Sequence, residues 1–213
     1  MKNKLKIKVC GMGDPENIGE VAKLMPDYLG FIFYEKSPRF VGKFDNLLTA
    51  KNLPESIKKV GVFVNANFDE IIQNVEKYSL KVVQLHGNEA PELCQKLKKS
   101  DLEVWKAFSV DQSFDFSITE NYLNTVDAFL FDSKGTGYGG HGIAFNWDLL
   151  ENYTFEIPFF LAGGISPENM DSVFSINNPA FFGVDVNSKF EICPGIKNIE
   201  TLKPLFSKIR GNH

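Results

Sequence analysis

Eight short apolar runs, each followed by a stretch with helical spacing, restrict most strongly what this 213-residue chain can fold into. The runs cover residues 5–11, 27–34, 57–65, 81–87, 103–109, 127–133, 158–164 and 180–186. They are nearly continuous in apolar residues, which is typical of parallel strands buried on both faces. The pattern therefore predicts strands that alternate with helices.

Helix-start signals in the connecting segments support this alternation. The first connector has Asp14 as a cap, Pro15 at the first helical position, and apolar residues at helical spacing behind them. Further helices are expected within residues 67–78, 88–99, 166–175 and 194–210, the last kinked or ended by Pro204. Residues 42–56 and 110–126 give weaker helix signals.

Eight β/α units predict one α/β domain over residues 1–213, a single parallel eight-stranded (β/α)8 barrel with the TIM-barrel architecture. The length is ample for one large core. A doubly wound open sheet is the alternative. It usually has fewer strands, and the glycine-rich segments of this chain come late rather than after the first strand.

The charge and the cysteine content narrow the class of partner. The formal net charge is −4, without a block of like charges, which argues against nucleic-acid or anionic-membrane partners. The three cysteines are far apart and form no disulfide framework, as expected in a reducing cytoplasm. No apolar run approaches the roughly 18 residues of a membrane helix. A cytoplasmic protein that binds a small molecule is expected, as a monomer or homodimer.

In a (β/α)8 barrel the functional residues lie at the C-terminal ends of the strands. Polar or glycine residues end nearly every predicted strand or begin the loop after it: Cys10, Arg39, Asn65, His86, Asp132, Gly163, Gly164 and Asp185. Core filling alone seldom produces such a series, so an active site is predicted at this end.

The glycine pair Gly163-Gly164 follows the seventh strand, where barrels commonly bind phosphate. Backbone N–H groups approach an anion closely at glycines, and a helix N-terminus favours negative charge. Asn187 and Ser188, after the eighth strand, add donors. A simple turn is the alternative. The glycine-rich loop 135–142 is a further phosphate contact, a lid or an ordinary surface loop.

Cys10 and Asp132 end strands one and six, and both are expected at the barrel mouth. A thiolate is a good proton acceptor near neutral pH once its pKa falls, and the helix N-terminus after Cys10 is expected to lower it. A buried aspartic acid can deliver a proton, so the pair suits an isomerisation. The alternatives are an inert buried cysteine and an aspartate that caps a helix or forms a loop salt bridge.

Two further side chains are candidates for binding. Arg39, after strand two, can clamp a carboxylate with both arms of its guanidinium, or be an ordinary surface arginine. His86, at the end of strand four, can orient a ligand or complete the barrel rim. The histidines are scattered and no Cys/His cluster exists, so no catalytic metal is expected.

Long motifs in this order along nearly the whole chain resemble phosphoribosylanthranilate isomerase. They are KVCGM (8–12), DYLGFIFYEKSPRFV (27–41), VGVFVN (60–65), VVQLHGNE (82–89), FLFDSKGTGYGGHG (129–142), FFLAGGISPEN (159–169) and GVDVNSKFEICPGIKN (183–198). The resemblance implies a (β/α)8 barrel and a step of tryptophan biosynthesis. That step is the Amadori rearrangement of N-(5′-phosphoribosyl)anthranilate to 1-(o-carboxyphenylamino)-1-deoxyribulose 5-phosphate, without a cofactor.

The resemblance also implies roles for the strand-end residues. Cys10 matches the family's general base and Asp132 its general acid. The remaining matches are substrate contacts: Arg39 at the anthranilate carboxylate, His86 and Asp185 along the substrate, and Gly163, Gly164, Asn187 and Ser188 at the phosphate. Two positions depart from the family pattern. Gly13 replaces a larger residue, which is expected to loosen the turn behind Cys10, and His141 replaces a small hydroxyl residue near the phosphate.

Three other functions fit parts of the sequence. The related aminoaldose isomerase of histidine biosynthesis does the same chemistry, but it is expected to carry aspartate where this chain has Cys10, and to grip a second phosphate. A phosphosugar-binding barrel without catalysis is disfavoured by the presence of both Cys10 and Asp132. A redox role for Cys10 lacks a nearby resolving cysteine.

Overall fold

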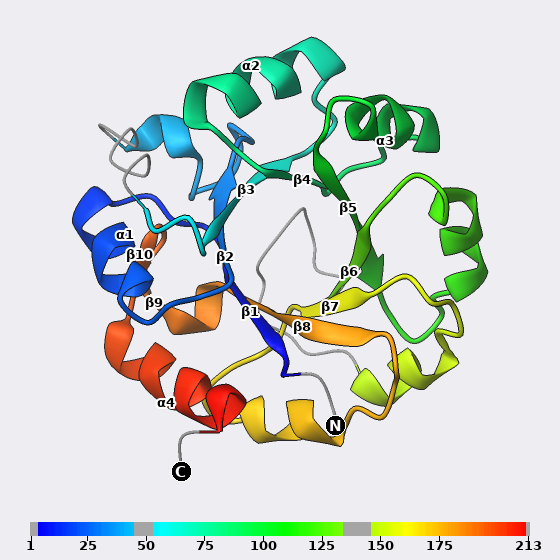
Figure 1. The fold of residues 1–213 in the computed structure, drawn as a ribbon. Helices are drawn as coiled ribbons and strands as arrows, with labels where there is room; N and C mark the ends of the chain where they lie inside the picture. The colour runs from blue at the N-terminus through cyan, green and yellow to red at the C-terminus, as the bar shows by residue number, and fades with distance from the viewer. Residues whose placement is uncertain (1–3, 45–52, 134–145, 212–213) are drawn as a thin grey trace.

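Eight parallel strands form a closed barrel in the computed structural model, which describes residues 4–44, 53–133 and 146–211 (Figure 1). The strands are β1 (Lys6–Val9), β2 (Tyr28–Ile32), β3 (Lys58–Phe63), β4 (Val82–Leu85), β5 (Glu103–Val110), β6 (Ala128–Ser133), β7 (Phe159–Ala162) and β8 (Phe181–Val186). They follow one another in chain order around the barrel, and β8 pairs with β1. The expected barrel is therefore confirmed, and a doubly wound open sheet is excluded.

Among the described residues, four α-helices cover the outside of the barrel (Figure 1). They are α1 (Pro15–Ala22), α2 (Phe68–Tyr78), α3 (Pro91–Lys98) and α4 (Ile199–Arg210). Side-chain caps begin three of them: Asp14 accepts from the N–H of Asn17 at 2.8 Å, and Asn67 and Asn198 cap α2 and α4 in the same way. Pro204 lies inside α4, which continues to Arg210, so the helix does not end at the proline.

The described connections between β5 and β8 contain short 3-10 helices in place of α-helices. They contain the 3-10 helices η3 (Phe116–Tyr122), η4 (Trp147–Asn152) and η5 (Met170–Ser175), and η1 (Val41–Lys43) and η6 (Ser188–Phe190) follow β2 and β8. The helix expected at 166–175 is thus only a 3-10 helix that starts four residues late. After η6, the strands β9 (Glu191–Cys193) and β10 (Ile196–Lys197) form an antiparallel pair that the sequence pattern did not predict.

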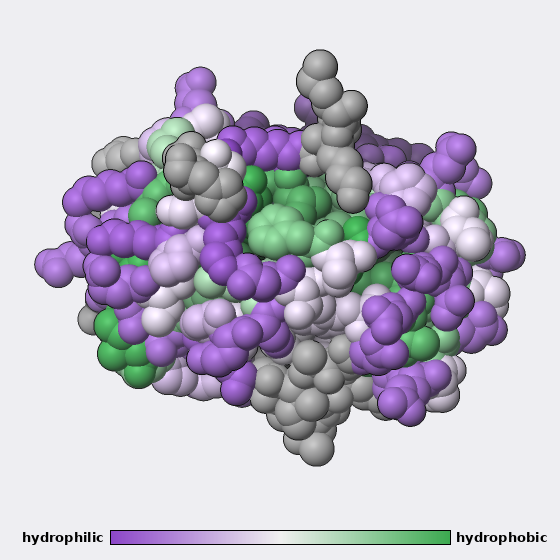
Figure 2. Space-filling model, turned by 90° about the horizontal axis from the view of Figure 1, so that it is seen from below, coloured by the Kyte–Doolittle hydropathy of each residue, from purple (hydrophilic) through white to green (hydrophobic). Residues whose placement is uncertain are grey.

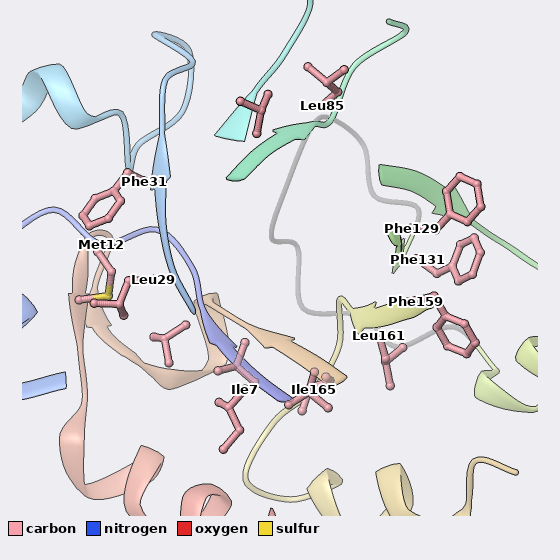
Figure 3. Packing of buried hydrophobic residues seen from close by; sticks show 14 of the residues in the cluster. Ile7, Met12, Leu29, Phe31, Leu85, Phe129, Phe131, Phe159, Leu161 and Ile165 are labelled. Carbon is pink, nitrogen blue, oxygen red and sulfur yellow. The ribbon is translucent and has the colours of Figure 1, made fainter. Parts of the chain in front are cut away.

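The strands separate two apolar layers, because successive side chains point to opposite faces. The outer layer packs between strands and helices, and Figure 3 shows part of it, including Ile7, Leu29 and Phe131. The inner layer fills the barrel and contains Tyr28 and Trp105, whose ring centroids are 4.8 Å apart. The barrel is therefore a packed core, and its C-terminal mouth is free to carry a site.

The side seen from below in Figure 2 is hydrophilic over most of its area, with an apolar region at its middle. A hollow lined by Phe174, Phe181 and Ile209, among others, lies close to the end of α4. Phe174 is 46% exposed. Within the described ranges, no helix combines the length and the apolar character that a membrane span requires.

Candidate active site

A cavity at the C-terminal ends of the strands contains every predicted site residue except Arg39 and Asn65. These residues are Cys10, His86, Asp132, Gly163, Gly164, Asp185, Asn187 and Ser188. Gln84 and the apolar side chains of Ile32, Val62, Ala162 and Ile165 complete the lining. Positions up to 178 residues apart in the sequence therefore share one cavity, as the strand-end rule for barrels predicts.

Strand alternation places the reactive side chains in this cavity. Cys10 lies two positions after Lys8, and Asp132 two positions after Leu130, which belongs to the inner layer. Residues at i and i+2 point to the same face of a strand, so both side chains continue the inner face toward the mouth. The two acidic groups thus enter one cavity from β1 and β6, strands that are not neighbours.

The Cys10 thiol is almost fully buried, with 5% exposure. Burial raises its pKa above 9.0, while the nearby ammonium of Lys8 acts to lower it. The expectation that a helix N-terminus lowers this pKa is therefore wrong for the free protein. Helix α1 begins only at Pro15, and the turn through Gly11, at φ +73°, separates it from the cysteine.

His86 connects Asp132 to the floor of the cavity. Its Nε2 lies 3.4 Å from Asp132 Oδ2, and its Nδ1 lies 3.2 Å from Gln84 Nε2. The two ring nitrogens of His86 thus face Gln84 and Asp132, so the imidazole bridges these two side chains.

Only one of the two carboxylate oxygens of Asp185 forms a hydrogen bond with the described residues. Its Oδ2 accepts from Lys8 Nζ at 2.7 Å, and its Oδ1 is buried without a hydrogen-bond partner among the described residues. Burial raises the pKa of Asp185, Lys8 opposes this, and the nearby Asp132 adds to it. A buried carboxylate oxygen without a partner is costly, so it is suited to accept a hydrogen bond from a ligand.

Gly163 and Gly164 both have positive φ angles, +70° and +71°. A side chain at Gly163 would overlap the carboxylate of Asp132 and the Oγ and N of Ser133. Only glycine therefore allows β7 to approach β6 this closely while the chain turns. The glycine pair has a structural reason in addition to any role in binding.

The phosphate corner differs from the expectation in one respect. The glycine pair does not lead directly into a helix, because residues 166–169 form a turn and the short η5 starts only at Met170. Asn169 closes this turn, donating to Gly164 O at 2.7 Å and accepting from the N–H of Ser166 at 2.8 Å. A helix dipole thus contributes little here, and anion binding relies on backbone and side-chain donors.

Arg39 does not line the cavity, so it does not lie with the other strand-end residues as the sequence predicted. Its guanidinium donates to Glu191 from Nε, at 2.9 and 3.0 Å, and from Nη2, at 2.7 Å. Glu191 also accepts from the fully buried Lys197, which in turn donates to Asn187 Oδ1 at 2.7 Å. Arg39 thus belongs to a buried charge network that reaches the cavity through Asn187.

Sequence reasoning missed four polar residues of this region: Lys8, Gln84, Glu191 and Lys197. Lys8 and Gln84 carried a detectable signal, since each is a polar residue inside an apolar run, two positions before a predicted site residue. Glu191 and Lys197 carried none, because they lie on the unexpected β9–β10 pair.

Close packing around Gly13 explains why the residue at this position is small. Its N–H donates to Gly195 O at 3.1 Å, and an added Cβ would lie 2.5 Å from the Phe44 ring. The turn behind Cys10 is thus hydrogen-bonded and packed, and the expected loosening is not found.

The loop 135–142 and His141 lie outside the described residues. In the described part of the chain, no cluster of three His, Cys, Asp or Glu side chains could hold a metal ion.

Comparisons with known proteins agree on one family. The family model for N-(5′-phosphoribosyl)anthranilate (PRA) isomerase matches residues 7–208. The chain is 47% identical over 204 residues to the N-(5′-phosphoribosyl)anthranilate isomerase of Parabacteroides distasonis, covering 95% of this chain and 92% of that protein.

Two crystal structures of phosphoribosyl anthranilate isomerases show the same architecture. The Thermotoga maritima structure has a TM-score of 0.84 and 32% identity, covering 97% of this chain and 99% of that one. A second, in complex with reduced 1-(o-carboxyphenylamino)-1-deoxyribulose 5-phosphate, has a TM-score of 0.82 and 30% identity, with the same coverage. The chain therefore belongs to the N-(5′-phosphoribosyl)anthranilate isomerase family.

Proposed function

We propose that the cavity at the barrel mouth is where this chain performs the isomerisation for which its family is named, with Cys10 as general base and Asp132 as general acid. The substrate is N-(5′-phosphoribosyl)anthranilate and the product 1-(o-carboxyphenylamino)-1-deoxyribulose 5-phosphate, in tryptophan biosynthesis. The observation that supports this most directly is that Cys10 and Asp132 line one cavity from two separate strands. A single ligand can then be reached by both groups.

The reaction needs two proton transfers. Asp132 gives a proton to the ring oxygen of the ribose as the C1′–O bond breaks, and the nitrogen lone pair forms a C1′=N iminium. The Cys10 thiolate then removes the proton from C2′, and the electrons form the C1′=C2′ bond of an enolamine, which tautomerises to the ketose. Each positioned proton transfer typically contributes about 10²–10⁴-fold to the rate.

Substrate binding favours the base as well. The iminium carries positive charge beside the carbon that loses its proton, and an opposite charge nearby stabilises a thiolate. The same charge makes the C2′ proton more acidic. The high pKa of Cys10 in the free protein is thus compatible with a thiolate that forms once the substrate occupies the cavity.

The other cavity residues are proposed to bind. Asp185 Oδ1 is available to accept from a ribose hydroxyl, and Gly163, Gly164, Asn187 and Ser188 form the phosphate corner. The N–H groups of Gly164 and Ser188 donate to no other described residue, which leaves them for an anion. Anchoring the phosphate holds the reacting carbons in place without taking part in the chemistry.

Arg39 is proposed to meet the anthranilate carboxylate from behind Gly11. A Cβ at Gly11 would lie 2.7 Å from Arg39 Cδ and from Asn187 Oδ1, so only glycine leaves room for the arginine stem beside the cavity. Because Glu191 holds Nε and Nη2, the remaining N–H groups of the guanidinium are those available to a ligand.

The chain is further proposed to act in the cytoplasm. It is proposed to form a single barrel domain and to be a monomer or a homodimer.

Turnover of freshly prepared N-(5′-phosphoribosyl)anthranilate, followed by the loss of anthranilate fluorescence, tests these roles. We expect rapid turnover by the wild type and a collapse of kcat in Cys10→Ser and Asp132→Asn, with circular dichroism showing both variants folded. Turnover that survives Cys10→Ser nearly intact would remove the cysteine from the mechanism while leaving the family assignment in place.

A further inference from the structure

Lys8 is a lysine in the middle of the barrel, with no exposed surface. It lies on β1, in register with Asp185 on β8, and its Nζ lies 2.7 Å from Asp185 Oδ2. Cys10 lies two residues further along the same face of the chain, just after β1, and the charge of Lys8 acts on its thiol. One ammonium is thus paired with the aspartate of the cavity and lies near its cysteine.

The neighbouring strand β2 leaves room for this arrangement. Gly30 has no side chain, and a Cβ there would lie 2.7 Å from Cys10 Sγ and 3.2 Å from Lys8 Cε. Cys10 and Lys8 therefore both pack against the backbone of β2 at Gly30. The arrangement depends on residues of three strands, β1, β2 and β8.

The charge on Lys8 persists in spite of its burial. Burial alone lowers the pKa of a lysine, but Asp185 and Cys10 raise it more, so that the pKa of Lys8 lies above 10.5. A buried ammonium is tolerated only when it is paired and hydrogen-bonded. Here one cation serves two groups that can each be an anion.

We propose that Lys8 is a positioning residue for the isomerisation, whose ammonium holds the Cys10 sulfur in place and stabilises it as the thiolate that takes the C2′ proton. Asp185 competes with Cys10 for the same positive charge. The proposal rests on the role of Cys10 as the base, and it adds the group that makes a thiolate possible at a buried position.

The competition predicts opposite effects of two substitutions. The charged groups that act on Cys10 are Lys8 on its own strand, Asp185 on β8 and Lys197 on β10. Removing the cation in Lys8→Met leaves the thiolate with less support, so the pKa of Cys10 rises. Removing the competing anion in Asp185→Asn leaves Lys8 to the cysteine alone, so this pKa falls. A purely structural role for Lys8 does not produce shifts of opposite sign.

The experiment measures the ionisation of Cys10 in the intact protein without substrate. The rate of iodoacetamide alkylation of the Cys10 peptide is followed by mass spectrometry as a function of pH, with the exposed Cys193 as an internal reference for the reagent. The thiolate ultraviolet absorbance, taken as the difference from Cys10→Ser, gives the same midpoint independently of reagent access. Lys6→Met is the matched control, since Lys6 is on the same strand but pairs with Asp27.

We expect the midpoint to rise by about one unit or more in Lys8→Met and to fall by about one unit or more in Asp185→Asn, as is typical for a charge in contact. Lys6→Met should leave it unchanged. In Lys8→Met, kcat should fall at least about 10-fold near neutral pH and recover as the pH rises, because the thiolate then forms without the cation. If Lys8→Met does not fold, the Asp185→Asn shift alone decides.

Midpoints that stay the same, or move in the same direction in both variants, would overturn the proposal. That result leaves the base assignment intact if Cys10→Ser is still inactive. Conversely, opposite shifts together with an active Cys10→Ser would show that Lys8 tunes the thiol but that the thiol is not the base. The two failures are thus distinguishable.

Discussion

The guanidinium of Arg39 and the carboxylate of Glu191, 152 residues apart in the sequence, form a two-point ion pair beside the active-site cavity. Glu191 also binds Lys197 and accepts from the N–H of Gly195 at 3.2 Å. Burial raises the pKa of Glu191, but Arg39 and Lys197 lower it further, so that it lies below 4.5. One buried anion thus pairs with two cations and connects the β9–β10 pair to the loop after β2.

Neutralising this anion should destabilise the whole barrel. Glu191→Gln leaves the largely buried Arg39 and the fully buried Lys197 without their counter-charge, and breaking a buried pair on one side typically costs about 3–5 kcal/mol. Urea denaturation measures the change in the free energy of unfolding. The control is Glu200→Gln, which removes an exposed pair with Lys203 and should cost less than about 1 kcal/mol. Equal losses in the two variants would contradict this account.

A methyl group at Gly163 should impair both catalysis and folding. Gly163→Ala places a Cβ against the Asp132 carboxylate and the backbone N of Ser133, at a φ of +70° that by itself disfavours a side chain by about 1–2 kcal/mol. A displaced acid can cost on the order of 10²-fold in kcat, which the fluorescence assay measures. Gly19→Ala is the control, because Gly19 has open space in α1 and should gain about 0.5–1 kcal/mol of stability. A Gly163→Ala enzyme with normal kcat would show that Asp132 need not lie where the structure places it.

The ionisation of Asp27 should make the free energy of unfolding depend on pH in the acid range. Burial raises its pKa, but the N–H of Ile7 and the side chains of Lys6 and Arg210 lower it further, so that the folded-state pKa lies below 3.8. The stabilisation by the ionised carboxylate is therefore complete above the unfolded value of 3.8 and is lost as the pH falls through the folded one.

Asp27→Asn removes this dependence. The difference in unfolding free energy between wild type and Asp27→Asn should therefore shrink as urea denaturation is repeated from about pH 6 to about pH 3. A difference that stays constant over this range would show that Asp27 does not act through its charge.

The strands were predictable because burial on both faces leaves a continuous apolar run, and all eight runs are strands. Their ends differ by up to two residues, since pairing with a neighbour, not hydrophobicity, decides where a strand stops. The helix expected at 166–175 failed for a different reason. Its Ser-Pro-Glu start signal is present, but Asn169 binds the turn at Gly164 and Ser166 instead. A local hydrogen bond thus outweighed the helix signal.

The cavity residues were predictable from their position at strand ends, whereas their partners were not. That Lys8 meets Asp185 depends on the register between β1 and β8, and that Glu191 meets Arg39 depends on the β9–β10 pair. Neither is encoded in local pattern or spacing. The ion pair of Arg39 with Glu191 could not be predicted for this reason.

Closure of the barrel by β1 and β8 has a consequence for how the protein is made. Asp185 is synthesised 177 residues after Lys8. Until then the nascent chain has no anion on β8 for this ammonium, and β1 lacks one of its two neighbours. A chain that is truncated before β8 therefore neither closes the barrel nor provides the buried lysine with its counter-charge. The Lys8–Asp185 pair thus forms only after β8 has been synthesised.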